Sequence, residues 1–308
     1  MSIIKSLSVG NGDMFYIKHN TDSFTTIDCC LSDENCIAIL AEIRCESAEK
    51  SITRFISTHP DDDHIRGIEY FEKVIGIYNF YCVANQATKE DETDSFNAYC
   101  KLRDSDKVFH LYDGCSRKWL NQSDNERDGS GINFLWPNTS NRLFKDELVK
   151  ALNGEAFNNL SPIFTYSIKQ GVEVMWMGDI ETTFLENVKM EIQWPQIDIL
   201  FAPHHGRDSG KVPSDILKKL NPQVIIIGEA PSQYLNYYQG YNIITQLSAG
   251  NITFDCREGW VHIYVSEPSY SVKFLHNLRE INMNYGNYIG SLQLGLGYYL
   301  GSFTTKGV

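Results

Sequence analysis

The chain has 308 residues, 42% of them hydrophobic, and a formal net charge of −12 at pH 7. This composition supports a substantial core, and the length suits one large domain or two small ones. The negative charge argues against a broad basic surface for nucleic acid, and the lack of an apolar run of about 18 residues argues against a membrane span.

The N-terminus and the cysteines indicate the cellular compartment. The first residues lack both the apolar stretch and the small-residue cleavage pattern of a signal peptide. None of the eight cysteines belongs to a Cys-x-x-Cys pair, so they are expected to be free thiols in a reducing compartment. A cytoplasmic protein is therefore expected.

The first part of the chain is predicted to mix strands and helices. β-Rich runs separated by turn residues predict strands, and apolar residues at helical spacing predict helices. In chain order the expected elements are strands 14–18 and 24–28, a helix at 37–44, a strand at 52–58, a helix at 65–74, a solvated charged segment at 89–94 that opens a helix through 102, and a polar loop at 121–131.

The remainder is predicted to be richer in strands. The expected elements are strands 132–137, 163–168, 172–177, 197–202 and 224–228, a short helix at 213–220, and a closing hairpin within 252–265. This alternation predicts an α/β fold of layered sheets flanked by helices. Beyond residue 268 the composition shifts to Tyr, Asn and Gly. We therefore predict a domain over 1–268 and a C-terminal extension of unassigned role over 269–308.

The stretch Thr58–His64 (THPDDDH) holds two imidazoles and three carboxylates directly after a predicted strand. His59 and Asp61 are two residues apart, so an extended backbone places both side chains on the same side. Asp63 and His64 are adjacent, so at a helix start they diverge toward neighbouring points. The stretch therefore predicts ligands for two metal ions, although an acidic turn that caps the next helix is the simpler alternative.

Two later segments offer the remaining ligands. Asp179 follows Gly178 immediately after a predicted strand, and glycine permits a close backbone approach there. His204 and His205 follow another predicted strand. Enzymes commonly present functional side chains on loops held by a rigid scaffold. These segments are therefore expected to converge with Thr58–His64 on one cleft.

The order and spacing of these motifs resemble the metallo-β-lactamase superfamily, whose signature His-x-His-x-Asp-His is followed by an Asp after a strand and then by a His. More narrowly, the chain resembles the hydrolase domain of the DNA-uptake proteins of the competence family, which has Asp in place of the second His. The matching segments are Val9–Asp13 (VGNGD), Ile27-Asp28, His59–His64, Asn158–Ser161 (NNLS), Gly178-Asp179 and Pro203–Gly206 (PHHG).

The resemblance implies an αββα sandwich of two mixed sheets flanked by helices. It also implies one metal site around His59 and Asp61. A second site would involve Asp63 and His64, with Asp179 bridging the two metals.

Of the two adjacent imidazoles, His205 is favoured as the ligand that completes the second site. His204 would then lie beside the substrate as a hydrogen-bond donor or general acid, so Asp63 and His204 are the predicted catalytic residues. The third His that the family usually has at the first site has no clear match, and Asn159 or Ser161 occupies that region. Asp13 and Asp28 are expected to hold loops near the site.

Two divalent metal ions are the predicted cofactors. Asp61 adds a hard oxygen donor, which favours manganese or magnesium beside zinc. Such ions generate hydroxide from water near neutral pH and polarise a phosphoryl or carbonyl oxygen. We therefore expect a phosphodiesterase or nuclease acting on a nucleotide or nucleic acid. The alternatives are hydrolysis of a thioester, lactone or lactam, and a non-catalytic metal-binding subunit that regulates a protein partner. No membrane partner is expected, and the oligomeric state is left open.

Overall fold

The computed structural model describes residues 1–295, and it is built from two mixed β-sheets. The first sheet has nine strands in the order β16-β15-β14-β1-β2-β3-β5-β6-β7. Strands β3, β5, β6 and β7 run parallel, whereas the other neighbours pair antiparallel. In that order the strands span Asn287–Gln293, Trp260–Val265, Ile252–Arg257, Ser2–Ser6, Phe15–Lys18, Ser23–Ile27, Ile52–Ile56, Phe80–Val83 and Val108–Leu111; the short β4 is Cys29–Cys30.

The second sheet has six strands in the order β13-β12-β11-β10-β9-β8. The four strands from β10 to β13 are parallel, and β8 and β9 add antiparallel pairings. In the order of the sheet the strands span Ile243–Thr245, Val224–Ile227, Ile199–Phe201, Glu173–Trp176, Ile163–Ser167 and Ile132–Trp136.

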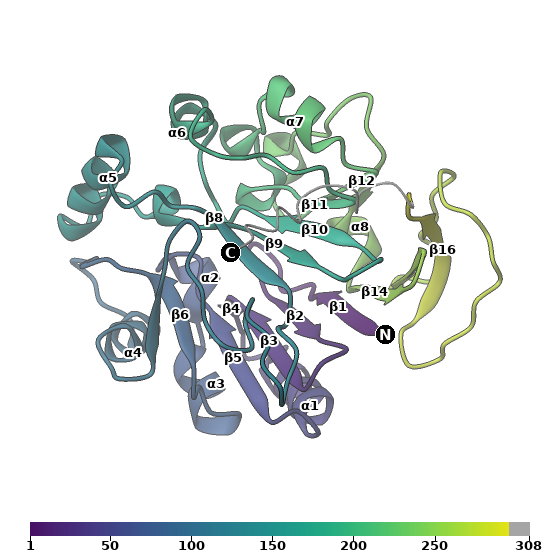
Figure 1. The fold of residues 1–308 in the computed structure, drawn as a ribbon, viewed down its shortest axis with the longest axis horizontal. Coiled ribbons are helices and arrows are strands. Elements are labelled where there is room, and N and C mark those ends of the chain that lie inside the picture. Colours follow the sequence, from purple (N-terminus) through teal and green to yellow (C-terminus); the bar gives the residue numbers. More distant parts are fainter. Residues whose placement is uncertain (296–308) are drawn as a thin grey trace, which may run out of the picture.

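Helices cover the outer sides of the paired sheets (Figure 1). One set is α1 (Cys36–Ser47), α3 (Ile68–Val74) and α4 (Asp94–Arg103); the other is α5 (Arg142–Leu152), α6 (Thr182–Val188) and α7 (Ser214–Leu220). Two one-turn helices are α2 (Asp62–Ile65) and α8 (Gln246–Ala249). The predicted fold class, two mixed sheets flanked by helices, is confirmed. Across residues 1–295, no helix has the length and apolarity that crossing a membrane requires.

Aromatic side chains fill the space between the two sheets. Phe15 of β2 meets Phe201 of β11 with ring centroids 4.9 Å apart. Phe201 also stacks on Trp176 of β10 and contacts Phe254 of β14, with centroids 4.9 Å and 5.9 Å away. Edge-to-face and stacked pairs of this kind add to the area that aromatic rings bury. The two sheets therefore share one hydrophobic core, which holds the loops at their ends in fixed positions.

The helix predicted over 65–74 is interrupted. Residues 62–65 and 68–74 are separate helices, because Gly67 adopts φ 79° between them. The chain turns there to pair with β4: the Leu31 amide donates to the Arg66 carbonyl at 2.9 Å. A Cβ on Gly67 would lie 2.7 Å from Leu31 Cβ, so a side chain does not fit. The break separates the acidic stretch from α3.

The segment predicted as a C-terminal extension contains a strand. Residues 287–293 form β16, which pairs antiparallel with β15 at the edge of the first sheet. Residues 296–308 lie outside the described part of the chain. The division at residue 268 therefore stays a prediction.

Candidate metal centre

Four of the predicted site segments follow strands that run parallel to a neighbour. Asp28 comes directly after β3, and Thr58–His64 comes after β5, its parallel neighbour. In the second sheet Asp179 follows β10, and His204-His205 follows the parallel β11. Because the carboxyl ends of parallel strands lie at the same edge of a sheet, each sheet brings two segments together. The shared core then brings the two edges together.

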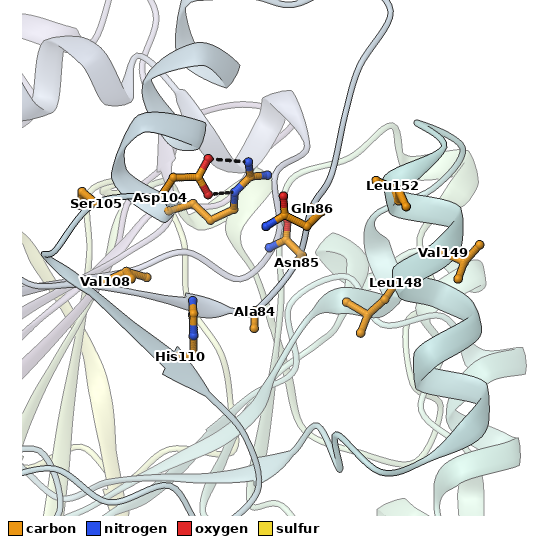
Figure 2. Close-up of a pocket in the computed structure, with 11 residues that line it drawn as sticks. Ala84, Asn85, Gln86, Asp104, Ser105, Val108, His110, Leu148, Val149 and Leu152 are labelled. Carbon is orange, nitrogen blue, oxygen red and sulfur yellow. Dashed lines mark hydrogen bonds and ion pairs between the residues drawn. The ribbon is translucent and has the colours of Figure 1, made fainter.

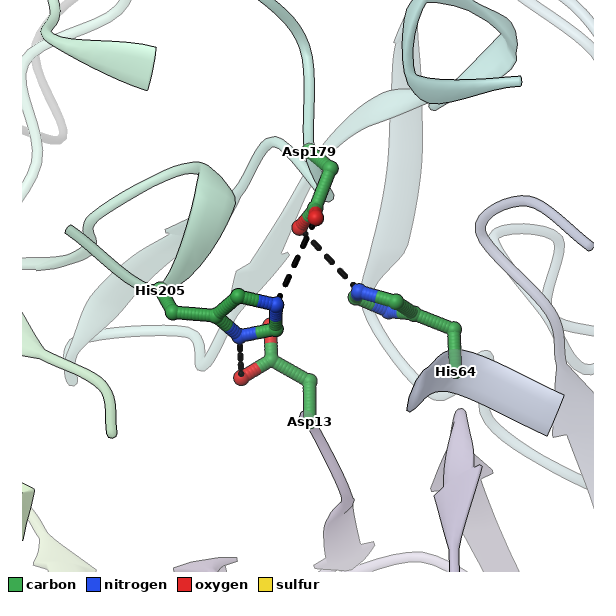
Figure 3. A group of neighbouring side chains, drawn as sticks. All are labelled: Asp13, His64, Asp179 and His205. Atoms are coloured by element: carbon green, nitrogen blue, oxygen red, sulfur yellow. Dashed lines mark ion pairs between the residues drawn. The ribbon is translucent and has the colours of Figure 1, made fainter. Parts of the chain in front are cut away.

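Asp179 is the centre of the cluster and is 2% exposed. His64 Nε2 lies 3.2 Å from Oδ1 of this carboxylate, and His205 Nε2 lies 3.4 Å from Oδ2 (Figure 3). His204 Nε2 and His59 Nε2 lie 3.7 Å and 4.0 Å from the same Oδ2. Four imidazoles therefore direct the same ring nitrogen at one buried carboxylate.

The opposite nitrogen, Nδ1, of each of the three fully buried imidazoles lies beside an oxygen atom. His64 Nδ1 lies 2.9 Å from Asp28 Oδ2, and His205 Nδ1 lies 3.1 Å from Asp13 Oδ1. His59 Nδ1 lies 3.0 Å from the Thr58 hydroxyl, with the Ser161 hydroxyl at 3.3 Å. A partner on Nδ1 fixes the ring orientation and, where it accepts a proton, leaves Nε2 free as a ligand.

Two further carboxylates border the cluster. Asp61 Oδ2 lies 3.4 Å from His59 Nε2, and Asp63 Oδ2 lies 3.3 Å from His205 Nε2. The other five residues predicted as metal ligands, together with His204, thus lie around Asp179. Four residues, Asp13, His64, Asp179 and His205, offer ligand atoms that all lie within 4.8 Å of one another.

The donors fit a divalent cation. Within the described chain, Nε2 of His59, His64 and His205, Nδ1 of His205 and Oδ1 of Asp179 are among the buried atoms that have no hydrogen-bond partner. Buried polar atoms are usually satisfied, and a cation would satisfy the three Nε2 atoms and the carboxylate together. Imidazole nitrogens with carboxylate oxygens form the usual donor set for zinc and also suit manganese.

The charges of the cluster keep its carboxylates ionised. Burial alone would raise the pKa of Asp179, but His205 and His64 together outweigh it and hold that pKa well below its usual value. Burial also opposes ionisation of Asp63, yet His205 and His64 lower its pKa. By contrast, burial lowers the pKa of His204, which favours its neutral form. At neutral pH the carboxylates are therefore charged and available as ligands.

An unusual backbone presents the two adjacent imidazoles. His204 and His205 both adopt left-handed backbone angles, with φ 54° and 56°, and Gly206 follows with φ 83°. Left-handed backbone costs a non-glycine residue about 1–2 kcal/mol, and such strain clusters at functional sites. Here it lets both rings face Asp179. The His204 ring is held further by a 2.9 Å contact between Nδ1 and the Ser209 hydroxyl.

Gly178 allows the loop after β10 to approach the loop before β9. Its φ is +51°, and a Cβ there would lie 2.5 Å from Ser161 Oγ. That same hydroxyl accepts a hydrogen bond from the Asp179 amide at 3.0 Å. A side chain at residue 178 would therefore displace the group that positions Asp179.

We expect Gly178→Ala to destabilise the protein more than Gly114→Ala. Gly114 also has a left-handed φ of +71°, but nothing lies within 4 Å of a Cβ there. The control should cost about 1–2 kcal/mol for backbone strain alone, and Gly178→Ala should add about 1–3 kcal/mol for overpacking. Urea unfolding of both variants measures the difference. Equal losses of stability would show that Ser161 yields without cost.

Asp13, Asp28 and Lys89 make contacts at the cluster that the sequence motifs indicated only in part. Asp13 and Asp28 were expected to hold loops, and the Asp13 amide donates to the Asp63 carbonyl while Asp28 accepts from the Thr58 amide. Asp13 also contacts His205 and Asp28 contacts His64, and their positions in the sequence did not indicate these contacts. Lys89, predicted to be solvated, lies with its ammonium 3.7 Å from Asp61 Oδ1. No sequence signal indicated that contact.

A separate cavity of about 660 Å³ lies between α5 and the edge of the first sheet (Figure 2). Leu148, Val149 and Leu152 of α5 line one side, and Ala84 and His110 line the other. The Arg103–Asp104 ion pair, 2.8 Å long, borders it. None of its lining residues belongs to the cluster around Asp179, so the cavity is not the candidate metal centre.

Comparison with known proteins yields structural similarities only. No family model matches the sequence, and no curated protein matches it significantly. Among solved structures, a metallo hydrolase, Igni18, from the hyperthermophilic archaeon Ignicoccus hospitalis is similar, with 14% identity, a TM-score of 0.46, and coverage of 82% of this chain and 99% of that one. Two structures of the metallo-β-lactamase SMB-1, bound to 2-mercaptoethanesulfonate and to mercaptoacetic acid, show 14% and 13% identity, TM-scores of 0.37, and coverage of 65% of this chain and 79% of theirs. We transfer neither family nor activity from these similarities.

Proposed function

We propose that this protein is a metal-dependent hydrolase that cleaves phosphodiesters. The observation that carries the proposal is the set of buried Nε2 atoms of His59, His64 and His205 that lie around the Asp179 carboxylate without a hydrogen-bond partner. A purely structural cluster would satisfy these atoms with hydrogen bonds, because an unmet buried polar group costs about 1–3 kcal/mol. A divalent cation satisfies them all.

Two metal positions follow from the placement of the donors. One is bounded by Asp63, His64 and His205, and the other by His59 and Asp61. Asp179 faces both sets: Oδ1 lies 3.2 Å from His64 Nε2, and Oδ2 lies 3.4 Å from His205 Nε2 and 4.0 Å from His59 Nε2. Asp179 would contribute to holding both metals, which we propose to be zinc or manganese, with magnesium also suited to the oxygen donors.

When bound, such a pair supplies hydroxide from water near neutral pH and neutralises charge on the scissile group. The protein holds the imidazoles by their Nδ1 partners and excludes water from all but one of them. His204 has 14% of its side chain exposed, whereas His59, His64 and His205 have none. His204 is thus the imidazole that a substrate reaches.

In phosphodiester hydrolysis one P–O bond breaks, another forms to the oxygen of water, and the leaving oxygen takes a proton. We assign His204 as the donor of a hydrogen bond from Nε2 to the leaving oxygen, because its Nδ1 is engaged by Ser209. We assign Asp63 to the second metal position, where it contacts His205, and propose that its carboxylate also takes part in the reaction.

Phosphodiesters are preferred over thioesters, lactones and lactams because of the donor chemistry. Three carboxylates, Asp61, Asp63 and Asp179, border the centre. Such oxygen-rich sites favour hard cations, which bind phosphate oxygens well. The similarity of the motif order to the competence hydrolases points the same way, and nucleotides or nucleic acids are the natural members of this substrate class.

The proposal is tested by metal analysis together with a substrate panel. Protein purified without chelator should contain zinc or manganese at near-integer stoichiometry, and EDTA should remove both metal and activity. With Mn²⁺ or Zn²⁺ restored, bis-p-nitrophenyl phosphate should be hydrolysed faster than a thioester or a lactam. Absence of tight metal binding would overturn the hydrolase assignment. Turnover of the thioester alone would overturn the phosphodiester assignment and leave the metal centre standing.

A further inference from the structure

Lys89 is a cation placed at the rim of the candidate metal centre. Its Nζ lies 3.7 Å from Asp61 Oδ1, and its side chain is 19% exposed. Its neighbours from Glu90 to Asp94 are exposed, as the sequence predicted for the whole segment. Lys89 thus departs from its own segment by turning toward the site.

Aromatic rings hold the ammonium in place. Nζ lies 5.2 Å from the centre of the Phe96 ring and 5.1 Å from that of Phe157. Both rings are buried, at 1% and 6% exposure, and they come from different halves of the chain. Cation–π contacts of this kind orient a lysine without using its N–H donors.

The backbone beside Lys89 is fixed as well. The Thr88 amide donates to the Ala151 carbonyl at 3.1 Å, and the Thr88 hydroxyl donates to the Leu152 carbonyl at 2.7 Å. Gly154, with φ +74°, lets this segment pass closely, since a Cβ there would lie 3.1 Å from the Thr88 carbonyl oxygen. Lys89 therefore extends from a segment anchored to the end of α5.

The ammonium has donors to spare. Lysine carries three N–H donors, yet among residues 1–295 Lys89 makes no hydrogen bond, and its single ion pair is longer than a hydrogen bond. A lysine that served only as a counter-ion of Asp61 would approach to about 2.8 Å. Position, orientation and unused donors together describe a group prepared for a ligand.

The charge of Lys89 indicates the kind of ligand. Resting on the proposed function, two divalent cations would bring four positive charges to a centre that holds the carboxylates of Asp13, Asp28, Asp61, Asp63 and Asp179. At the rim, where Asp61 is its single ion-pair partner within the described residues, the Lys89 ammonium adds a positive charge that attracts anions. An anionic oxygen that reaches the rim can accept a charge-assisted hydrogen bond from the ammonium.

We infer that Lys89 is a substrate-positioning residue that binds an anionic oxygen of a phosphate group at the metal centre. The ammonium selects for anionic over neutral substrates, and it orients the phosphate against the side of the centre bounded by His59 and Asp61. The aromatic pair Phe96 and Phe157 fixes its direction.

The test measures binding of inorganic phosphate to the metal-loaded protein by calorimetry at fixed ionic strength. Lys89→Met keeps the apolar stem but removes the charge, and it should weaken phosphate binding about 10- to 100-fold, as loss of a charged hydrogen bond does. Lys89→Arg should keep binding within about threefold. The control Lys107→Met removes an ammonium that pairs with Glu72 at 2.8 Å on the surface and should leave phosphate binding unchanged.

Metal affinity and thermal unfolding of each variant are measured in parallel. Lys89→Met should bind metal at least as tightly as the wild type, because a competing cation beside Asp61 has been removed. Unchanged phosphate affinity in folded, metal-loaded Lys89→Met would overturn this inference alone. A loss of metal binding in that variant would assign Lys89 a structural role instead. A wild-type protein that binds no metal would overturn the proposed function and this inference with it.

Discussion

Asp179→Asn should lose the metals and nearly all hydrolytic activity. The change keeps the shape of the side chain but replaces one of two oxygens by an N–H donor and removes the negative charge. The new donor would face His64 or His205, whose Nε2 atoms lie 3.2 Å and 3.4 Å from the carboxylate. We expect metal affinity to fall by well over about 100-fold, since loss of outer partners alone costs about 10- to 100-fold, and kcat to fall at least about a thousandfold.

A matched control for this variant is Asp255→Asn. Asp255 is as buried as Asp179, at 0% exposure, and it pairs with Arg257 at 2.7 Å within strand β14, outside the cluster. The control should lower stability but retain full metal content by mass spectrometry of the dialysed protein. Full metal occupancy in Asp179→Asn would contradict the proposed role of this carboxylate in holding both metals.

The sequence indicated which segments meet at the site better than it indicated the residues that support them. His59, Asp61, His64 and Asp179 were expected to meet because each follows a predicted strand, and the structure brings them together where the ends of parallel strands share one edge of a sheet. The expectation came from local pattern and motif order, and it specified no distance. Their role as metal ligands stays a prediction.

The partners behind the ligands depend on tertiary packing, which local pattern does not encode. Asp13 reaches His205 across 192 positions of the numbering only because two sheets stack. Lys89 lies in a run of charges typical of a solvated segment, and the burial of its stem follows from Phe157, far along the chain. Sequence spacing carries no information about either contact.

Several elements also escaped sequence analysis. Strands β6, β7 and β13, at Phe80–Val83, Val108–Leu111 and Ile243–Thr245, were not predicted. Helix α5 is amphipathic, but its exposed Val149 and Leu152 disturb the polar face that marks a surface helix. The break at Gly67 is a response to pairing with β4, so the apolar spacing of 65–74 still indicated one helix.

Asp28→Asn should weaken metal binding without removing any ligand. Oδ2 of Asp28 accepts from the Thr58 hydroxyl at 2.7 Å and faces His64 Nδ1 at 2.9 Å, while Oδ1 accepts from the Thr58 amide at 2.7 Å. An asparagine amide cannot reproduce this. If its NH₂ faces His64, it donates to Nδ1 and moves the ring proton to Nε2, the atom needed for the metal. If its NH₂ faces Thr58, two N–H donors oppose each other.

Backbone strain does not explain the expected loss, because asparagine tolerates the left-handed φ of 55° at residue 28 as aspartate does. We therefore expect about 10- to 100-fold weaker Mn²⁺ or Zn²⁺ binding in competition with a chelator, and a shift of the His64 proton to Nε2 in ¹⁵N NMR spectra. The control Asp22→Asn alters a carboxylate that accepts from the Ser51 amide at 2.9 Å, remote from the cluster, and should leave affinity unchanged. Equal metal affinities in Asp28→Asn and wild type would mean that His64 reaches its ligand tautomer without Asp28. In that case Asp28 would not be needed to hold the proton on His64 Nδ1 and so keep Nε2 free for the metal.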